Sequence, residues 1–106
     1  MRGLKLITEN YVFSEYPLSD RLLKALEQLS IEKPTEVQAQ TLPPALEGKD
    51  LLVAAETGSG KTLAFGLPLL QRLDAASDRV QGLVLVPTRE LASQVSAALQ
   101  EIADGL

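Results

Sequence analysis

The stretch at residues 55–62 constrains the fold of this chain more than any other feature. It reads Ala-Glu-Thr-Gly-Ser-Gly-Lys-Thr, follows the apolar run 51–54, and precedes a helix-like segment at 61–73. A strand, a glycine-rich turn and a helix in this order direct backbone N–H groups and the positive end of the helix dipole at an anion. The pattern therefore predicts a phosphate-binding loop.

The residue types of this loop suggest specific roles. Lys61 supplies a mobile cation for the outer phosphates of a nucleotide, and Thr62 places a hydroxyl where Mg²⁺ would bind. We therefore predict Lys61 and Thr62 as catalytic residues and Thr62 as the metal ligand. The predicted phosphate-binding residues are Ala55, Glu56, Thr57, Gly58, Ser59, Gly60, Lys61 and Thr62.

The composition excludes several classes of chemistry. The 106 residues contain no Cys and no His, which excludes disulfides, thiol nucleophiles, zinc sites and histidine acid–base catalysis. The net charge is −4, so any nucleic-acid site has to be local. No apolar run approaches the roughly 20 residues of a membrane span, and the start lacks the apolar region of a signal peptide. We expect one domain and a cytoplasmic protein.

Capping signals predict a helix near each end of the chain. Ser19 is a good N-cap for a helix that begins at Asp20, and Thr88 can cap a long helix over residues 89–104. Each helix has an apolar stripe at helical spacing. The stripes comprise Leu22, Leu23, Leu26 and Leu29 in the first helix, and Leu91, Val95, Leu99 and Ile102 in the second.

A third, short helix is predicted around Gln38. Thr35 and Gln38 have the spacing of a capping box, in which each side chain bonds the backbone N–H of the other. Two consecutive prolines, Pro43 and Pro44, should interrupt this helix, and Gly48 should end it. Pro68 should likewise bend the helix that follows the phosphate-binding loop.

Two uninterrupted apolar runs predict buried strands. Residues 51–54 and 82–86 contain only apolar side chains and one glycine, as expected for strands that are covered on both faces of a parallel sheet. The order helix, helix, strand, helix, strand, helix therefore predicts an α/β fold with parallel strands flanked by helices.

Four elements together resemble the DEAD-box RNA helicases. Residues 55–62 resemble motif I of that family, and residues 87–92 (Pro-Thr-Arg-Glu-Leu-Ala) resemble motif Ia. Residues 34–38 (Pro-Thr-Glu-Val-Gln) are similar to the core of the Q motif, and Phe13 lies at the usual distance upstream. The resemblance implies a P-loop NTPase fold. Residues 1–106 would be the N-terminal portion of the first RecA-like, ATP-binding domain, with the Q-motif region at 12–40.

The resemblance also implies that ATP, with Mg²⁺, is the ligand. Gln38 would read the adenine edge, Phe13 would stack on the adenine, and the backbone of Lys33 would border it. A carboxamide offers a donor and an acceptor, which matches adenine N7 and N6 but not guanine N7 and O6. The local sequence alone favours an ordinary core aromatic at Phe13 and a capping residue at Gln38.

RNA is the second ligand that the resemblance implies. Pro87, Thr88 and Arg89 would hold RNA phosphates, which positions a strand without reading its sequence. A strand-ending proline and a capped helix account for Pro87 and Thr88 locally. They do not account for Arg89 at the carboxyl end of a predicted parallel strand, where ligands gather in α/β proteins.

The resemblance implies ATP-dependent RNA unwinding by the full-length protein. The 106 residues contain no Asp-Glu-Ala-Asp and no Ser-Ala-Thr sequence, so we expect this chain alone to bind ATP weakly and not to hydrolyse it. Two alternatives are open. One is another P-loop enzyme, such as a small nucleotide kinase or a different ATPase, although such enzymes have no need of Gln38 and residues 87–92. The other is a truncated, non-catalytic module that self-associates through exposed strand edges.

Overall fold

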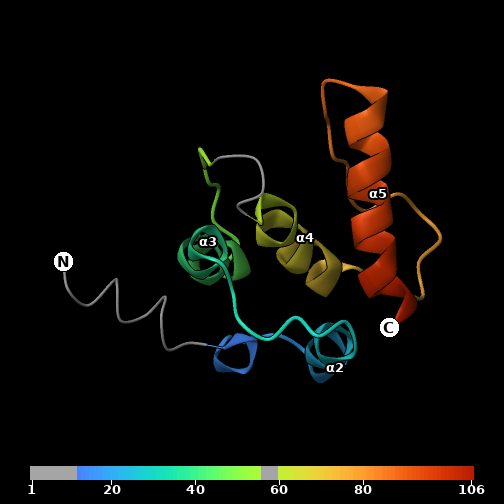
Figure 1. The fold of residues 1–106 in the computed structure, drawn as a ribbon. Coiled ribbons are helices and arrows are strands. Elements are labelled where there is room, and N and C mark those ends of the chain that lie inside the picture. Colours follow the sequence, from blue (N-terminus) through green and yellow to red (C-terminus); the bar gives the residue numbers. More distant parts are fainter. Residues whose placement is uncertain (1–11, 56–59) are drawn as a thin grey trace.

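The computed structural model describes residues 12–55 and 60–106. In these ranges the chain forms helical segments joined by irregular chain (Figure 1). They are the 3-10 helix η1 (Phe13–Glu15) and the α-helices α2 (Asp20–Gln28), α3 (Glu36–Leu46), α4 (Lys61–Arg72) and α5 (Arg89–Asp104). Among the described helices, none combines the length and the apolar character that crossing a membrane requires.

Helices α2 and α5 begin where their capping residues predict. Ser19 Oγ accepts a hydrogen bond from Leu22 N–H at 3.2 Å, and Thr88 Oγ1 accepts one from Leu91 N–H at 3.1 Å. Each bond satisfies a first-turn N–H group that has no partner inside its own helix. The predicted bounds of α5 are confirmed at both ends.

The two prolines in α3 do not interrupt the helix, so that prediction is wrong. The helix continues through Pro43 and Pro44 to Leu46. Both prolines lie in the last turn, where a φ of about −65° suits helical backbone and only the bonds to carbonyls four residues earlier are lost. Gly48 follows with φ of 89°, which confirms the predicted glycine after the helix. Helix α4 likewise runs through Pro68.

The helices enclose an apolar core with α4 at its centre. Helix α3 packs on α4, α4 packs on α5, and α2 packs on α5 (Figure 1). Fully burying one large apolar side chain is worth about 1.5–3 kcal/mol, so the shared core holds the axis of α4 between its neighbours. The largest fully buried side chains, drawn from all four α-helices, are Leu22, Leu26, Leu42, Leu67 and Ile102.

The two predicted strands are not formed in the described structure. Residues 51–54 and 82–86 carry no strand, and Leu52 and Leu85 are 103% and 85% exposed. A strand requires a neighbour to complete its hydrogen-bond ladder. No backbone hydrogen bond between described residues involves either run. The prediction of parallel strands is therefore wrong for the described residues, because neither run has another strand beside it.

The prediction for the apolar stripe of α5 is wrong in part. Val95 and Ile102 are buried as the apolar stripe predicts, whereas Leu91 is 37% exposed. Leu91 lies in the first turn of α5, directly after the unpaired run 82–86. Only the later turns of α5 reach α2 and α4, so only they are covered.

Candidate functional site

The start of α4 carries the end of the predicted phosphate-binding loop. Gly60 precedes α4 with φ of 89° and ψ of 21°, a left-handed conformation that glycine adopts without steric cost. Lys61 and Thr62 form the first turn, Lys61 exposed and Thr62 half-buried. No described side chain caps this helix, and the binding of an anion by its first N–H groups stays a prediction. Ala55 is half-buried before the loop, and predicted residues 56–59 lie outside the described ranges.

Gln38 on α3 connects the two predicted binding stretches. Its Oε1 accepts a hydrogen bond from Thr35 N–H at 2.9 Å, and its Nε2 donates to the Gly60 carbonyl at 3.0 Å. Thr35 Oγ1 accepts from Gln38 N–H at 3.4 Å, which completes the capping box and confirms that prediction. Gln38 itself is 3% exposed, whereas Thr35 is exposed. A carboxamide retains one more N–H and one more lone pair, and their use for adenine stays a prediction.

The packing against α3 leaves no room for a side chain at position 60. A Cβ there would lie 2.5 Å from Gln38 Nε2 and 2.7 Å from Thr35 Oγ1. Glycine is therefore required for two independent reasons, the positive φ and the close approach. Sequence analysis missed Thr35 as a neighbour of the loop, because the capping-box spacing reveals only the local role of this residue.

The remaining residues expected beside adenine lie before α3. Phe13 is 3% exposed and belongs to the core cluster with Tyr16 and Leu18, which is the role that its local sequence favours. Its backbone N–H donates to the Glu32 carbonyl at 3.3 Å, so η1 is joined to the turn before α3. Lys33 is exposed in that turn. A contact of Phe13 or Lys33 with adenine stays a prediction.

Pro87, Thr88 and Arg89 lie at the start of α5, in another part of the molecule. All three are exposed, and Figure 1 shows the first turn of α5 well away from the first turns of α3 and α4. The Thr88 hydroxyl is used as the helix cap. The Arg89 guanidinium forms no ion pair with a carboxylate of the described residues. Its contact with RNA stays a prediction, but its charge is not neutralised by a described neighbour.

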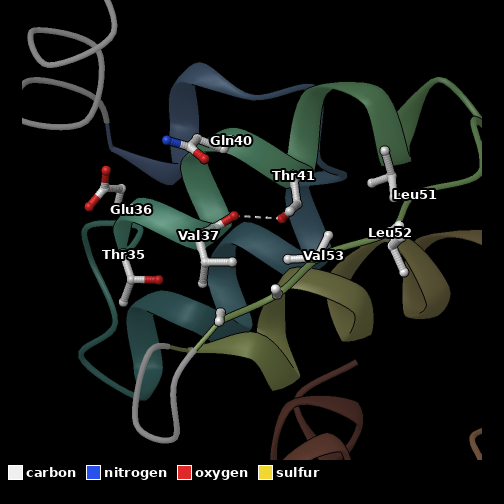
Figure 2. Close-up of a pocket in the computed structure, with 10 residues that line it drawn as sticks. Thr35, Glu36, Val37, Gln40, Thr41, Leu51, Leu52 and Val53 are labelled. Carbon is white, nitrogen blue, oxygen red and sulfur yellow. Dashed lines mark hydrogen bonds between the residues drawn. The ribbon is translucent and has the colours of Figure 1, made fainter.

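A groove of about 740 Å³ lies between α3 and residues 51–55 (Figure 2), and Thr35 and Ala55 of the candidate site line it. Neither Gln38 nor Lys61 lines it, and Glu36 is the one charged residue among those that do. The negative charge of Glu36 disfavours phosphate beside it. The lining consists of Thr35, Glu36, Val37, Gln40 and Thr41, together with residues 51–55.

The residues at the start of α4 fit a magnesium ion that arrives with its nucleotide. The described residues contain no group of three or more His, Cys, Asp or Glu side chains that could hold a metal by themselves. Mg²⁺ commonly binds through few protein ligands together with substrate phosphates, and contact of the half-buried Thr62 with such an ion stays a prediction. Between described residues the salt bridge is Lys49 Nζ to Glu47 Oε1 at 3.1 Å, so Lys61 is not neutralised by a described carboxylate.

Comparison with known proteins identifies close relatives. A family model described as DEAD/DEAH box helicase matches residues 35–106. The chain is 52% identical over 90 residues to the DEAD-box ATP-dependent RNA helicase CshA of Bacillus cereus, covering 85% of this chain and 17% of that protein. It is 46% identical over 90 residues to the protein of the same name from Bacillus subtilis, of which it covers 18%. The chain thus spans less than a fifth of the length of these curated relatives.

The backbones of solved protein structures superpose on the backbone of this chain. A DEAD box protein from Methanococcus jannaschii superposes with a TM-score of 0.81 at 36% identity, over 87% of this chain and 26% of that one. Saccharomyces cerevisiae Dbp5 bound to RNA and ADP BeF3 gives 0.84 at 32% identity, over 89% and 25%. These matches support a P-loop NTPase fold and do not favour a small nucleotide kinase or another kind of ATPase.

We predict that Gly60→Ala destabilises the chain by about 1–3 kcal/mol, the usual cost of holding a side-chain-bearing residue in a disfavoured backbone conformation. The new Cβ also displaces the Gln38 carboxamide. Gly82→Ala is the matched control, because its Cβ would chiefly meet the flexible end of Leu69 and its φ is not positive. Urea unfolding midpoints measure both changes, and equal shifts for the two variants would contradict the prediction.

Proposed function

The chain belongs to the DEAD/DEAH-box helicase family, and on this premise we propose that it is the ATP- and RNA-binding part of an ATP-dependent RNA helicase. Residues 1–106 would form the N-terminal portion of the first RecA-like domain, with residues 12–40 as its Q-motif region. The observation that carries the proposal is the 3.0 Å hydrogen bond from Gln38 Nε2 to the Gly60 carbonyl. This bond joins Gln38, in the proposed Q-motif region, to Gly60, near the end of the proposed phosphate-binding loop. The proposed compartment is the cytoplasm.

The start of α4 would bind the phosphates of ATP. The first-turn N–H groups and the helix dipole attract the negative oxygens, and the exposed Lys61 ammonium compensates charge on the outer phosphates. The Thr62 hydroxyl would hold Mg²⁺, which when bound neutralises charge on the β- and γ-phosphate oxygens. Positioning and charge compensation are the main contributions that a protein makes to phosphoryl transfer.

The Q-motif region would recognise adenine. Gln38 has one N–H and one lone pair left after its bonds to Gly60 and Thr35, and these suit adenine N7 and N6. Phe13 and the backbone of Lys33 would flank the base. Because Gln38 also contacts the start of α4, base recognition and phosphate binding would be linked through a single side chain.

The start of α5 would contact RNA. Arg89 and Thr88 are exposed beside the first N–H groups of a 16-residue helix, and Pro87 precedes them. This arrangement suits a phosphate of the RNA backbone and does not read the bases. Its separation from the start of α4 in Figure 1 is consistent with two ligands bound at two places.

We predict that Lys61→Ala weakens ATP binding about 10- to 100-fold, because one charge-assisted interaction contributes about 1.5–3 kcal/mol. Lys24→Ala is the control, since Lys24 is an exposed lysine on α2, outside the proposed site. Equilibrium titration with a fluorescent ATP analogue measures both. An unchanged dissociation constant for Lys61→Ala would show that this loop does not bind the phosphates.

A second prediction concerns the base. ATP should displace the same fluorescent analogue at lower concentration than GTP, because guanine offers only acceptors where adenine offers an acceptor and a donor. Both nucleotides carry the same triphosphate, so the difference isolates the base contacts. Equal competition by ATP and GTP would contradict the proposed role of Gln38 while leaving the phosphate site intact.

We also propose that the 106-residue chain self-associates through its two apolar runs. Leu52, Leu83 and Leu85 are 103%, 78% and 85% exposed, and neither run is paired within the described residues. Unpaired apolar segments of this kind favour pairing with another chain.

We expect concentration-dependent association of the 106-residue chain in sedimentation or light scattering. The double change Leu52→Lys and Leu85→Lys should shift the chain toward monomer, because charged side chains oppose strand pairing. Ser93→Lys, at an exposed position on α5, is the control for the added charge. A monomeric wild-type chain at high concentration would contradict this proposal.

A further inference from the structure

Gln71, in the last turn of α4, makes two hydrogen bonds to the segment that precedes α2. Its Nε2 donates to the Pro17 carbonyl at 2.7 Å, and its Oε1 accepts from Ser19 N–H at 2.7 Å. Both halves of the carboxamide are engaged at once, which fixes the orientation of a side chain that would otherwise rotate freely. The partners are 54 and 52 residues away in sequence, so these bonds join distant parts of the chain.

Helix α4 is thereby held at both ends by glutamine carboxamides. Gln38 binds the Gly60 carbonyl before the first turn, and Gln71 binds the segment before α2 from the last turn. About 11 residues of helix, or roughly 16 Å, separate the two attachments. Core packing already holds α4 between α3 and α5, and these two attachments add polar contacts that join its two ends to the Q-motif region and to the segment before α2.

The segment that Gln71 binds is the continuation of η1. Phe13 N–H bonds the Glu32 carbonyl, so the segment is tied to the turn before α3 at one end and to α4 at the other. Between these ties, Tyr16 and Leu18 are buried in the core. Phe13 and Lys33 are the residues that would flank the base. Their position relative to the start of α4 therefore depends on Gln71 as well as on Gln38.

We propose that Gln71 is a positioning residue for nucleotide binding. By holding the C-terminal end of α4, it fixes the position of the first turn, which would bind phosphate, relative to the residues that would contact adenine. The inference rests on the proposed function, because it concerns the same nucleotide site. Gln71 itself contacts neither phosphate nor base, and its effect is transmitted through the orientation of α4.

The test compares two ligands that share the phosphate contacts. Gln71→Met keeps the length and the helix preference of the side chain but removes both hydrogen bonds. We expect its affinity for ATP to fall about three- to tenfold, the equivalent of one to two modest hydrogen bonds. Its affinity for inorganic tripolyphosphate should stay within twofold of wild type, because that ligand needs only the start of α4.

Gln94→Met, at an exposed position on α5, is the matched control and should change neither affinity. Gln71→Glu retains the acceptor for Ser19 N–H but sets a carboxylate oxygen against the Pro17 carbonyl, so its ATP affinity should fall at least as far as that of Gln71→Met. If circular dichroism shows that Gln71→Met does not fold, the ATP affinity of Gln71→Glu tests the positioning role instead.

The possible outcomes separate the two proposals. Unchanged ATP binding by Gln71→Met, or an equal loss for ATP and tripolyphosphate, would overturn the positioning role and leave the proposed function standing. A wild-type chain that binds neither ligand would overturn the proposed function and, with it, this inference. A loss confined to ATP supports the positioning role.

Discussion

The hydrogen bond between Gln38 Nε2 and the Gly60 carbonyl is the interaction on which the arrangement of the site depends. The same carbonyl also accepts the first helical hydrogen bond of α4, from Ala64 N–H at 3.3 Å. Both lone pairs of one oxygen are therefore used, one to start α4 and one to attach it to α3. Because Gln38 is buried, losing one partner would leave a polar group unsatisfied at a cost of about 1–3 kcal/mol.

This junction accounts for several local features together. Gly60 is glycine because its φ is positive and because Thr35 and Gln38 lie where a Cβ would be. The capping box of α3 orients the Gln38 side chain. The same side chain therefore caps a helix locally and contacts a residue 22 positions away in sequence. The packing of α4 against α3 and α5 then supports the orientation that the junction sets. No described side chain caps the first turn of α4, and the binding of an anion there stays a prediction.

The similarity to solved DEAD-box structures does not depend on strands in the described residues. TM-scores of 0.81 and 0.84 report that the chain follows the same path as its relatives. That path is maintained by helix packing, whereas strand character needs a hydrogen-bonded neighbour. The runs 51–54 and 82–86 have the composition of buried strands, but Leu52 and Leu85 remain exposed because no described strand lies beside them.

The sequence by itself determined the features that depend on residues within about four positions of one another. The caps at Ser19, Thr35 and Thr88 and both ends of α5 all belong to this group. Only the tertiary structure decided the others: the absence of strands from the described residues, and the long-range bonds of Gln38 and Gln71. Capping and helical periodicity are satisfied locally, whereas burial and strand pairing require partners from distant parts of the chain. No local pattern could reveal Gln71, because its two partners lie more than 50 residues away.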